Sequence, residues 1–201
     1  MKKTVFVAFL TSIMLSNCSS DNDSPVLVPL SQEEISDLKF LREEEKLARD
    51  VYLFSYNKYQ ISIFNSISQS EQKHMNSILS LLNKYGIPDP ASIEIGVFVN
   101  QDLQTLYNNL TALSDISSVE ALKVGATIED LDISDINHFT VNTTKSDLLS
   151  VYDNLTCGSK NHIRNYTSQL VINGVVYVPQ FISVEYYNMI LSLTNAGCNN
   201  N

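Results

Sequence analysis

The sequence predicts an all-α protein, an antiparallel four-helix bundle with a long crossover between the second and third helices and a further helix at the C-terminus. Two observations support this class. Apolar residues recur at alternating spacings of three and four along four long segments, the pattern of helices with one buried face. The segments are joined by short links except for one of about thirty residues, residues 87–117, which is longer than neighbouring antiparallel helices need. With 201 residues, the chain can form one domain with a substantial core.

The first helix is predicted to begin at Ser31, because Ser31-Gln32-Glu33-Glu34 has the pattern of a capping box. Its inward face is predicted to carry Leu38, Leu41, Glu45, Ala48 and Tyr52. The remaining charged residues of this segment are predicted to lie mostly on other faces, and they are Glu43, Glu44, Lys46, Arg49 and Asp50.

The second helix, residues 63–85, has the most regular pattern, and Gly86 and Pro88 end it. Its apolar face includes two polar side chains, Glu71 and His74, which are three residues apart and therefore point in the same direction. The alternating positions of that face are Phe64, Ile67, Glu71, His74, Ile78, Leu81 and Tyr85.

The crossover, residues 87–117, is predicted to contain a short helix over residues 102–113. The third helix is predicted to run from Ser117 or Ser118 to about Asn137, with Glu129 on its inward face and Asp132 one turn further on. The fourth begins near residue 146 and carries His162 inward, with Gly158 inside it.

Two features are predicted after the fourth helix. Asn173-Gly174 is a turn signal between the β-prone runs 170–172 and 175–178, which allows at most a small hairpin. A last helix is predicted over residues 183–195, with Tyr186, Tyr187, Ile190 and Leu193 available for packing.

The N-terminus has the pattern of an export signal rather than of a folded element. Residues 1–18 combine a charged start with a short apolar run and end in Leu-Ser-Asn-Cys, which resembles the lipobox of bacterial lipoproteins, so Cys18 is the predicted lipidation site. An ordinary cleaved signal and an uncleaved anchor are the alternatives. Residues 19–30 then form a flexible tether and residues 31–197 the bundle domain. This places the protein at the cell envelope, exported and held to the membrane by its lipid.

The charge of the chain argues against nucleic acid as a partner. The formal charge of −9 becomes −11 when the signal is removed, because Lys2 and Lys3 are lost. An acidic domain is repelled by phosphates.

Two cysteines, Cys157 and Cys198, remain in an oxidising compartment and form either a disulfide or two separate thiols.

All four bundle helices place a candidate metal ligand on the inward face. Burying an ionised carboxylate is costly unless a counter-charge accompanies it. Carboxylates and imidazoles without thiolates suit a transition metal such as iron, manganese or zinc. The candidate ligands are Glu45, Glu71, His74, Glu129 and His162. The alternatives are a metal-free hydrogen-bonded pair of Glu71 and His74, solvated acids at Glu45 and Glu129, and an ordinary core or partly exposed histidine at His162. His138 is predicted not to be a ligand.

Two motifs resemble those of ferritin-like proteins. Residues 45–52 are similar to the Glu-x-x-Ala-Arg-x-x-Tyr motif of rubrerythrins, and residues 70–74 resemble the second-helix motif of the rubrerythrin and bacterioferritin group. The chain also resembles a little-characterised bacterial and archaeal ferritin-like family of unknown function, through the run 121–129 and the Gly-Ser-x-Asn-His run 158–162. The resemblance covers about residues 31–170.

The resemblance implies one or two metal ions, iron in the first place with manganese or zinc as alternatives, and oxygen- or peroxide-linked redox chemistry. It assigns Glu45 and His74 to one ion, makes Glu71 a bridge, and places Tyr52 beside the site. Glu129 and His162 resemble the ligands of the third and fourth helices. The electron donor would be a separate protein, and the pairing of two bundles into a homodimer is left open.

The chain departs from the family pattern at one position. Ser159 stands where the fourth-helix Glu-x-x-His motif has its glutamate, so a second bridging carboxylate is missing. Asp132 is the candidate substitute. A single ion, a weak second site and a site without metal are therefore also predicted outcomes. The alternative function is a non-catalytic binding or structural module of the cell envelope with a degenerate site, and metal sequestration without turnover is a third.

Overall fold

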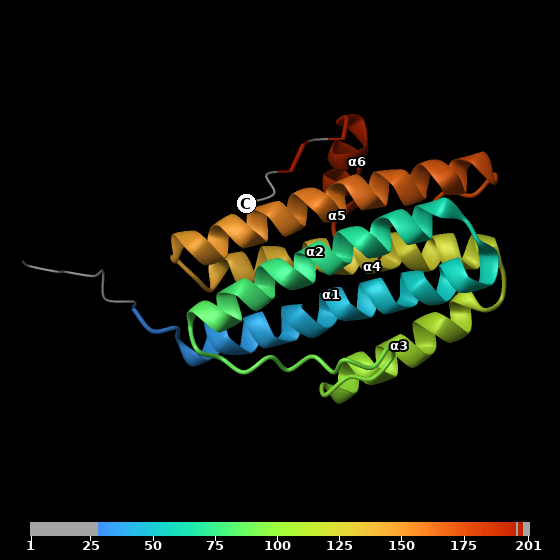
Figure 1. Ribbon diagram of the computed structural model, residues 1–201. Helices are drawn as coiled ribbons and strands as arrows, with labels where there is room; N and C mark the ends of the chain where they lie inside the picture. Colours follow the sequence, from blue (N-terminus) through green and yellow to red (C-terminus); the bar gives the residue numbers. More distant parts are fainter. Residues whose placement is uncertain (1–27, 196, 199–201) are drawn as a thin grey trace, which may run out of the picture.

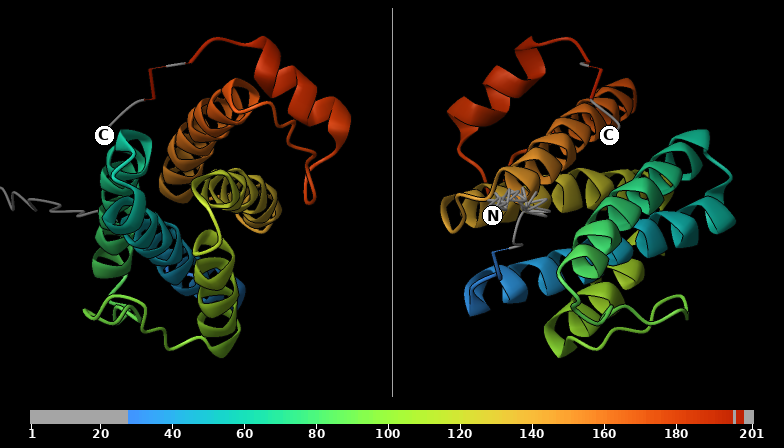
Figure 2. Two further views of the ribbon diagram at one scale, coloured as in Figure 1. Left: turned by 90° about the vertical axis from the view of Figure 1, so that its right-hand side faces the viewer. Right: turned by 60° about the vertical axis from the view of Figure 1, so that its left-hand side comes forward.

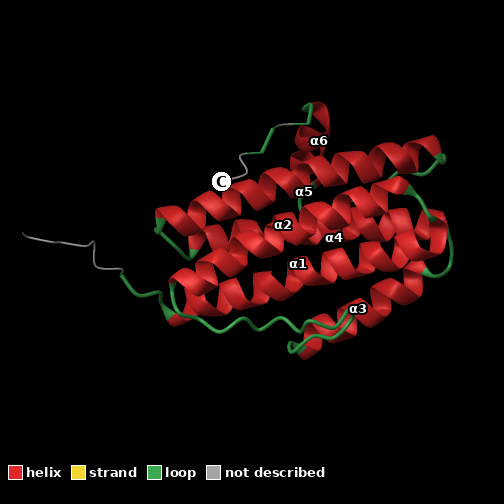
Figure 3. Cartoon of the chain, in the orientation of Figure 1, coloured by secondary structure: helices red, strands yellow, loops and turns green. Residues whose placement is uncertain are grey.

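The structure is a computed structural model that describes residues 28–195 and 197–198. The predicted signal, Cys18 and most of the predicted tether lie outside these residues. The described part is all-helical, with no strand (Figures 1 and 3). Its helices are α1 (Gln32–Tyr59), α2 (Ser62–Lys84), α3 (Gln101–Ser114), α4 (Ser118–Val141), α5 (Ser146–Ile172) and α6 (Val184–Ser192).

Four long helices, α1, α2, α4 and α5, form the bundle, with α1 packed on α2 and α4 packed on α5. Residues 85–117 carry the chain from one end of the bundle to the other along its outside, and α3 lies within this crossover against α1 and α4 (Figures 1 and 2). The predicted all-α bundle with a long crossover and a C-terminal helix is confirmed.

The helix starts follow from local capping. Ser31 Oγ accepts a hydrogen bond from the Glu34 amide, and the Glu34 side chain accepts one from the Ser31 amide, which is the predicted capping box. At the other end of α1, Gln60 takes a left-handed conformation with φ of 55°. This residue allows α2 to begin two residues later and to run antiparallel to α1.

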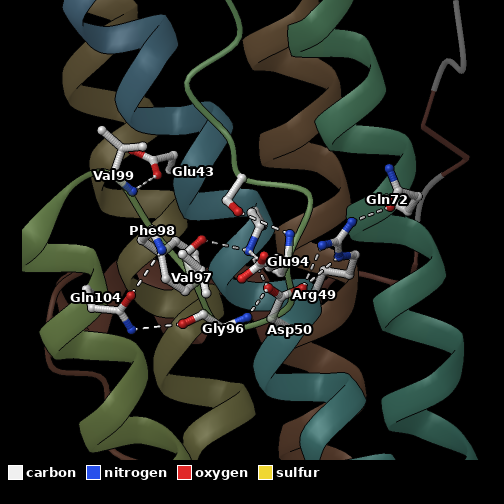
Figure 4. Close-up of polar contacts among 12 residues, drawn as sticks. Glu43, Arg49, Asp50, Gln72, Glu94, Gly96, Val97, Phe98, Val99 and Gln104 are labelled. Carbon is white, nitrogen blue, oxygen red and sulfur yellow. Dashed lines mark hydrogen bonds and ion pairs between the residues drawn. The ribbon is translucent and has the colours of Figure 1, made fainter.

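The crossover is held by charged side chains of α1 that lie on a different face from Glu45, and it buries them. Lys46 is fully buried, and its ammonium donates to Asp50 at 2.6 Å and to the carbonyl oxygens of Glu94 and Val97. Asp50 also accepts the amide of Gly96 (Figure 4). Buried charges are tolerated when they are paired in this way.

A second carboxylate of α1 holds the next part of the crossover. Glu43 accepts a hydrogen bond from the amide of Val99 at 2.6 Å (Figure 4) and another from the amide of Asn100 at 3.1 Å. The crossover backbone therefore replaces water as the hydrogen-bonding partner of this face of α1.

The apolar core is divided into two clusters, and polar residues lie between them. One cluster contains Ala48, Ile67, Ile128 and Ile163, and the other contains Leu41, Ile78, Ile136 and Leu155. In α1, α2 and α5 the candidate ligands lie between residues of the two clusters, whereas in α4 Glu129 lies between Ile128 and Ile133 of the first cluster. Hydrocarbon thus closes the polar layer at both ends, which lowers its exposure to water and strengthens electrostatic interactions inside it.

The C-terminal region consists of a loop followed by the short helix α6. No hairpin forms, because α5 continues through Ile172 and residues 175–178 follow as a loop. This loop and the start of α6 are held by Asp130 of α4, which is fully buried and accepts hydrogen bonds from the Tyr177 hydroxyl and the amides of residues 180–182. Tyr187 and Ile190 of α6 are buried as predicted, whereas Leu193 is exposed.

Among the described helices, none has both the length and the apolar character required to cross a membrane.

Candidate metal centre

The centre of the polar layer is Glu71, which is fully buried. Its two carboxylate oxygens face different histidines. Oε2 lies 2.6 Å from Nδ1 of His74 on the same helix, and Oε1 lies 2.8 Å from Nδ1 of His162 on α5. The two imidazole rings lie near one another, with centroids 5.7 Å apart and planes inclined by 28°. This is the arrangement of a carboxylate that bridges two positions.

Two further carboxylates complete two groups of ligands. Glu45 of α1 places Oε2 3.2 Å from His74 Nδ1, and Glu129 of α4 places Oε2 3.4 Å from His162 Nδ1. The groups are therefore Glu45, Glu71 and His74 on one side, and Glu71, Glu129 and His162 on the other. In each group one ligand atom from every residue lies within 4.8 Å of the others. The structure thus brings together all five predicted ligands.

Several of these atoms have no hydrogen bond in the described part of the protein. They are Oε1 of Glu45, both oxygens of Glu71, Oε2 of Glu129 and Nδ1 of His162, all buried. These atoms lie close to one another, but they form no hydrogen bonds among themselves in the described part of the chain. A buried polar atom without a partner is costly. Oxygen and imidazole donors converging on two points fit divalent transition-metal ions.

The protonation states of the metal-free site reflect a balance of burial and charge. Burial raises the pKa of Glu45 to about 8, although the charge of His74 opposes the shift. Burial also acts to raise the pKa of Glu71, but His162 and His74 outweigh it and the pKa is lowered. For His162, burial is outweighed by the carboxylates of Glu71 and Glu129, which raise its pKa to about 10. Without metal, protons on the histidines therefore supply the counter-charge.

Two hydrogen bonds orient the ligands from outside. The Tyr52 hydroxyl donates to Oε1 of Glu129 at 2.6 Å, which leaves Oε2 directed at His162. On His162, Nε2 lies 3.1 Å from Ser70 Oγ. If Nδ1 binds a metal, the ring proton is on Nε2, which then donates a hydrogen bond to Ser70 Oγ. Contacts of this kind set the ring orientation of a metal-binding histidine. Ser70 was not predicted, and its place one residue before Glu71 gave no distinctive signal.

Two predicted residues do not enter either group. Ser159 is buried, but its hydroxyl donates to the carbonyl oxygen of Leu155 on its own helix at 3.2 Å. Asp132 is also buried, and neither of its oxygens has a hydrogen bond to any residue that the structure describes. Burial raises the pKa of Asp132 well above its usual range, and the next cause is the carboxylate of Glu44, a residue the sequence had placed on another face of α1. His138 is exposed, away from both groups.

The C-terminal tail is fixed to the same helix as His162. Cys157 and Cys198 form a disulfide with their Cα atoms 5.7 Å apart. The side-chain amide of Asn161 also donates to Cys198 Sγ. The tail therefore lies beside the α2–α5 side of the centre.

Comparison with known proteins agrees with the fold and adds a family. Residues 34–194 match DUF2202, described as an uncharacterised protein domain. The chain is 50% identical to "Uncharacterized protein MJ0754" of Methanocaldococcus jannaschii over 165 residues, which cover 82% of this chain and 89% of that protein. It is also similar to the crystal structure of hypothetical protein MJ0754 from Methanococcus jannaschii, with a TM-score of 0.83 and 48% identity, over 85% of this chain and 98% of that one. Since the family match extends over most of its length, the chain belongs to the DUF2202 domain family.

Proposed function

We propose that this protein is an exported ferritin-like protein that binds two transition-metal ions, iron in the first place, between its four bundle helices. The observation that carries the proposal is the geometry of Glu71, whose two oxygens face the Nδ1 atoms of His74 and His162 from opposite sides. One ion would be held by Glu45, Glu71 and His74, and the other by Glu71, Glu129 and His162. Manganese and zinc accept the same ligands.

The proposed chemistry is oxygen- or peroxide-linked redox. Two ferrous ions supply the two electrons that reduce hydrogen peroxide, so that two Fe²⁺, one peroxide and two protons give two Fe³⁺ and two waters. Three protein ligands for each ion leave coordination positions open, as a catalytic rather than a closed structural site requires. Ser159 in place of a carboxylate increases this openness, because α5 supplies only His162.

Metal stoichiometry tests the site. The full chain, purified without a chelating tag and stripped of metal, should bind two Fe²⁺ or Co²⁺ per chain in calorimetric titration. His74→Ala and His162→Ala should each remove one ion, and Glu71→Gln should weaken both. Glu120→Gln is the matched control, because Glu120 lies on α4 with a surface partner, Lys123. Circular dichroism of each variant monitors the fold.

The results distinguish the function classes. Full stoichiometry in all three site variants, or no binding of any of the ions, would contradict the proposal. The latter result would favour the second candidate, a cell-envelope module whose histidines and carboxylates form a metal-free charge network. Ferrous oxidation at two irons per peroxide indicates an enzyme, and binding without oxidation indicates metal sequestration.

The proposed location rests on residues 1–18 and is tested separately. Mass spectrometry of the mature N-terminus should find a lipid-modified Cys18, and Cys18→Ala should release the protein from the membrane fraction. An unmodified N-terminus at another position would indicate an ordinary cleaved signal. Metal binding by the bundle does not depend on this outcome.

A further inference from the structure

The disulfide between Cys157 and Cys198 lies beside the candidate metal centre. The chain returns to α5 after α6, and α6 itself packs against α5 (Figures 1 and 2). Cys198 lines a pocket of about 240 Å³ between α2 and α5, and His74 and His162 line the same pocket. One half of the disulfide therefore faces the same space as both proposed histidine ligands.

The other half of the disulfide is connected to His74 through one residue of α5. Cys157 is followed directly by Gly158 in this helix. A Cβ atom built on Gly158 would lie 2.5 Å from Nε2 of His74, so the imidazole rests against the backbone of this residue. Electrons therefore have a short route from the Cys157 sulfur, along the α5 backbone, to the ring of a proposed metal ligand.

The surroundings of Cys157 favour thiol–disulfide exchange. This residue is partly exposed and lines a second pocket, which shares no described lining residue with the histidine pocket. Two cations, Lys160 and Arg164, line the second pocket with it, and Asp153 is the one acid among its described lining residues. Reactive cysteines are typically partly exposed and close to cations, which favour the thiolate. A dithiol reductant can therefore reach this sulfur without entering the histidine pocket.

The tail that carries Cys198 is also held to α5 by contacts that do not involve sulfur. The Arg164 guanidinium donates to the side chain of Asn195 at 2.8 Å and to the carbonyl oxygen of Ile190 at 3.0 Å. The Asn195 amide donates in turn to Asn165 at 3.2 Å. These hydrogen bonds keep the tail beside α5 when the disulfide is reduced, so the two thiols stay close enough to form the bond again.

We propose that Cys157 and Cys198 are a redox pair that delivers two electrons to the candidate metal centre. This inference rests on the proposed function, which requires an electron donor. A dithiol outside the chain reduces the disulfide by thiol–disulfide exchange. In this step the external dithiol becomes a disulfide, and Cys157 and Cys198 become thiols.

The second half of the cycle restores the disulfide. The two S–H bonds break and the S–S bond forms, which releases two electrons and two protons. The electrons reduce two ferric ions of the proposed centre, and the resulting ferrous ions reduce peroxide with the two protons, as in the proposed function. In sum, two thiols and one hydrogen peroxide give one disulfide and two waters.

The first test is reduction of the native disulfide in the metal-free full chain. Dithiothreitol should open it while circular dichroism shows unchanged helices. Alkylation with iodoacetamide, followed by peptide mass spectrometry, should then find both Cys157 and Cys198 as thiols, resolved from Cys18. A disulfide that opens only when the bundle unfolds would overturn the proposal, because an external dithiol could not then supply electrons.

The second test is reoxidation of the reduced chain after dithiothreitol has been removed without oxygen. With iron bound, one equivalent of hydrogen peroxide should restore the disulfide faster than in the metal-free chain, by about tenfold or more. The absorbance of the iron should show it returning to the ferrous state. Cys198→Ser should bind the same amount of iron, form no disulfide and leave the iron ferric. Thr156→Ala, which changes the neighbour of Cys157 in the second pocket, should behave as wild type.

Metal analysis of the same samples separates the redox pair from the proposed function. If iron binds and peroxide oxidises it while the thiols of Cys157 and Cys198 persist, the redox pair is overturned and the proposed function stands. If no metal binds, the proposed function fails and the redox pair fails with it. Equal rates of reoxidation with and without iron would also overturn the redox pair, because peroxide would then react with the thiols directly.

Discussion

His74 Nε2 occupies the space that a side chain on residue 158 would fill, since a Cβ atom built on Gly158 lies 2.5 Å from it. Gly158 is inside α5, where glycine costs about 1 kcal/mol relative to alanine. Glycine therefore lowers the stability of the helix at this position, but any residue with a Cβ atom would displace His74, a proposed metal ligand. The role of Gly158 at the site is thus to leave room for the His74 ring, and it does not depend on the flexibility of the helix.

Gly158→Ala should therefore remove metal from one group and leave the other. Metal stoichiometry should fall from two to about one per chain, because the added methyl group moves His74 but not His162. Thermal stability should change little, since the gain of about 1 kcal/mol in helix propensity offsets the strain. Ser168→Ala, at an exposed position of α5, is the control. Two ions bound with unchanged affinity would show that His74 is not a ligand.

Tyr52→Phe should destabilise the metal-free protein by about 1–3 kcal/mol, the cost of leaving a buried acceptor unpaired. The lost contact is the hydrogen bond from the Tyr52 hydroxyl to Glu129 Oε1. Urea unfolding with unchanged m-values measures the effect. Tyr56→Phe, on the same helix but with a hydroxyl that makes no hydrogen bond to the described residues, should change stability by less. An equal loss in the two variants would remove the assigned role of the Tyr52 hydroxyl.

The stability of the metal-free protein should fall as the pH rises above neutrality. The pKa of His162 is about 10 in the folded protein against 6.5 unfolded, and that of Glu45 is about 8 against 4.5. Because both folded pKa values are raised, the folded state holds these protons more tightly. Their contribution is complete below the unfolded values and is lost as the pH passes through about 8 and then about 10.

Melting temperatures between pH 6 and pH 10 check this prediction. Metal affinity should show the opposite trend and increase with pH, because a metal must displace protons from the histidines. His162→Gln should flatten the decline of the metal-free melting temperature at the upper end of the range. A constant or rising melting temperature in the metal-free wild type would contradict the assigned charge balance.

Lys46→Met should release the crossover from α1. It removes the donor to the carbonyl oxygens of Glu94 and Val97 and breaks a buried ion pair, a change that typically costs about 3–5 kcal/mol. Hydrogen exchange at residues 94–99 should increase more than elsewhere in the bundle. Lys58→Met, which removes a partly exposed lysine from the same helix, should cost no more than about 1 kcal/mol. Unchanged exchange in residues 94–99 would show that other contacts hold the crossover.

The helices and the inward positions of Glu45, Glu71 and His74 could be predicted from the sequence, because periodicity and capping depend on residues close together in the chain. The burial of Glu43 and Lys46 could not. A helical pattern identifies one packed face, and these residues lie on a second face that is covered by a segment about fifty residues away. The sequence allowed at most a small hairpin after the fourth helix, and none forms, since α5 extends through the β-prone residues 170–172.

The sequence alone therefore determined the long helices and the inward positions of Glu45, Glu71 and His74. Only the tertiary structure decided that each oxygen of Glu71 meets a different histidine, that Ser159 turns to its own helix while Asp132 stays outside both groups, and that Gly158 makes room for His74. The physical reason is that helix formation is a local property of the chain. The separation of two ligand atoms on different helices depends instead on how complete helices pack.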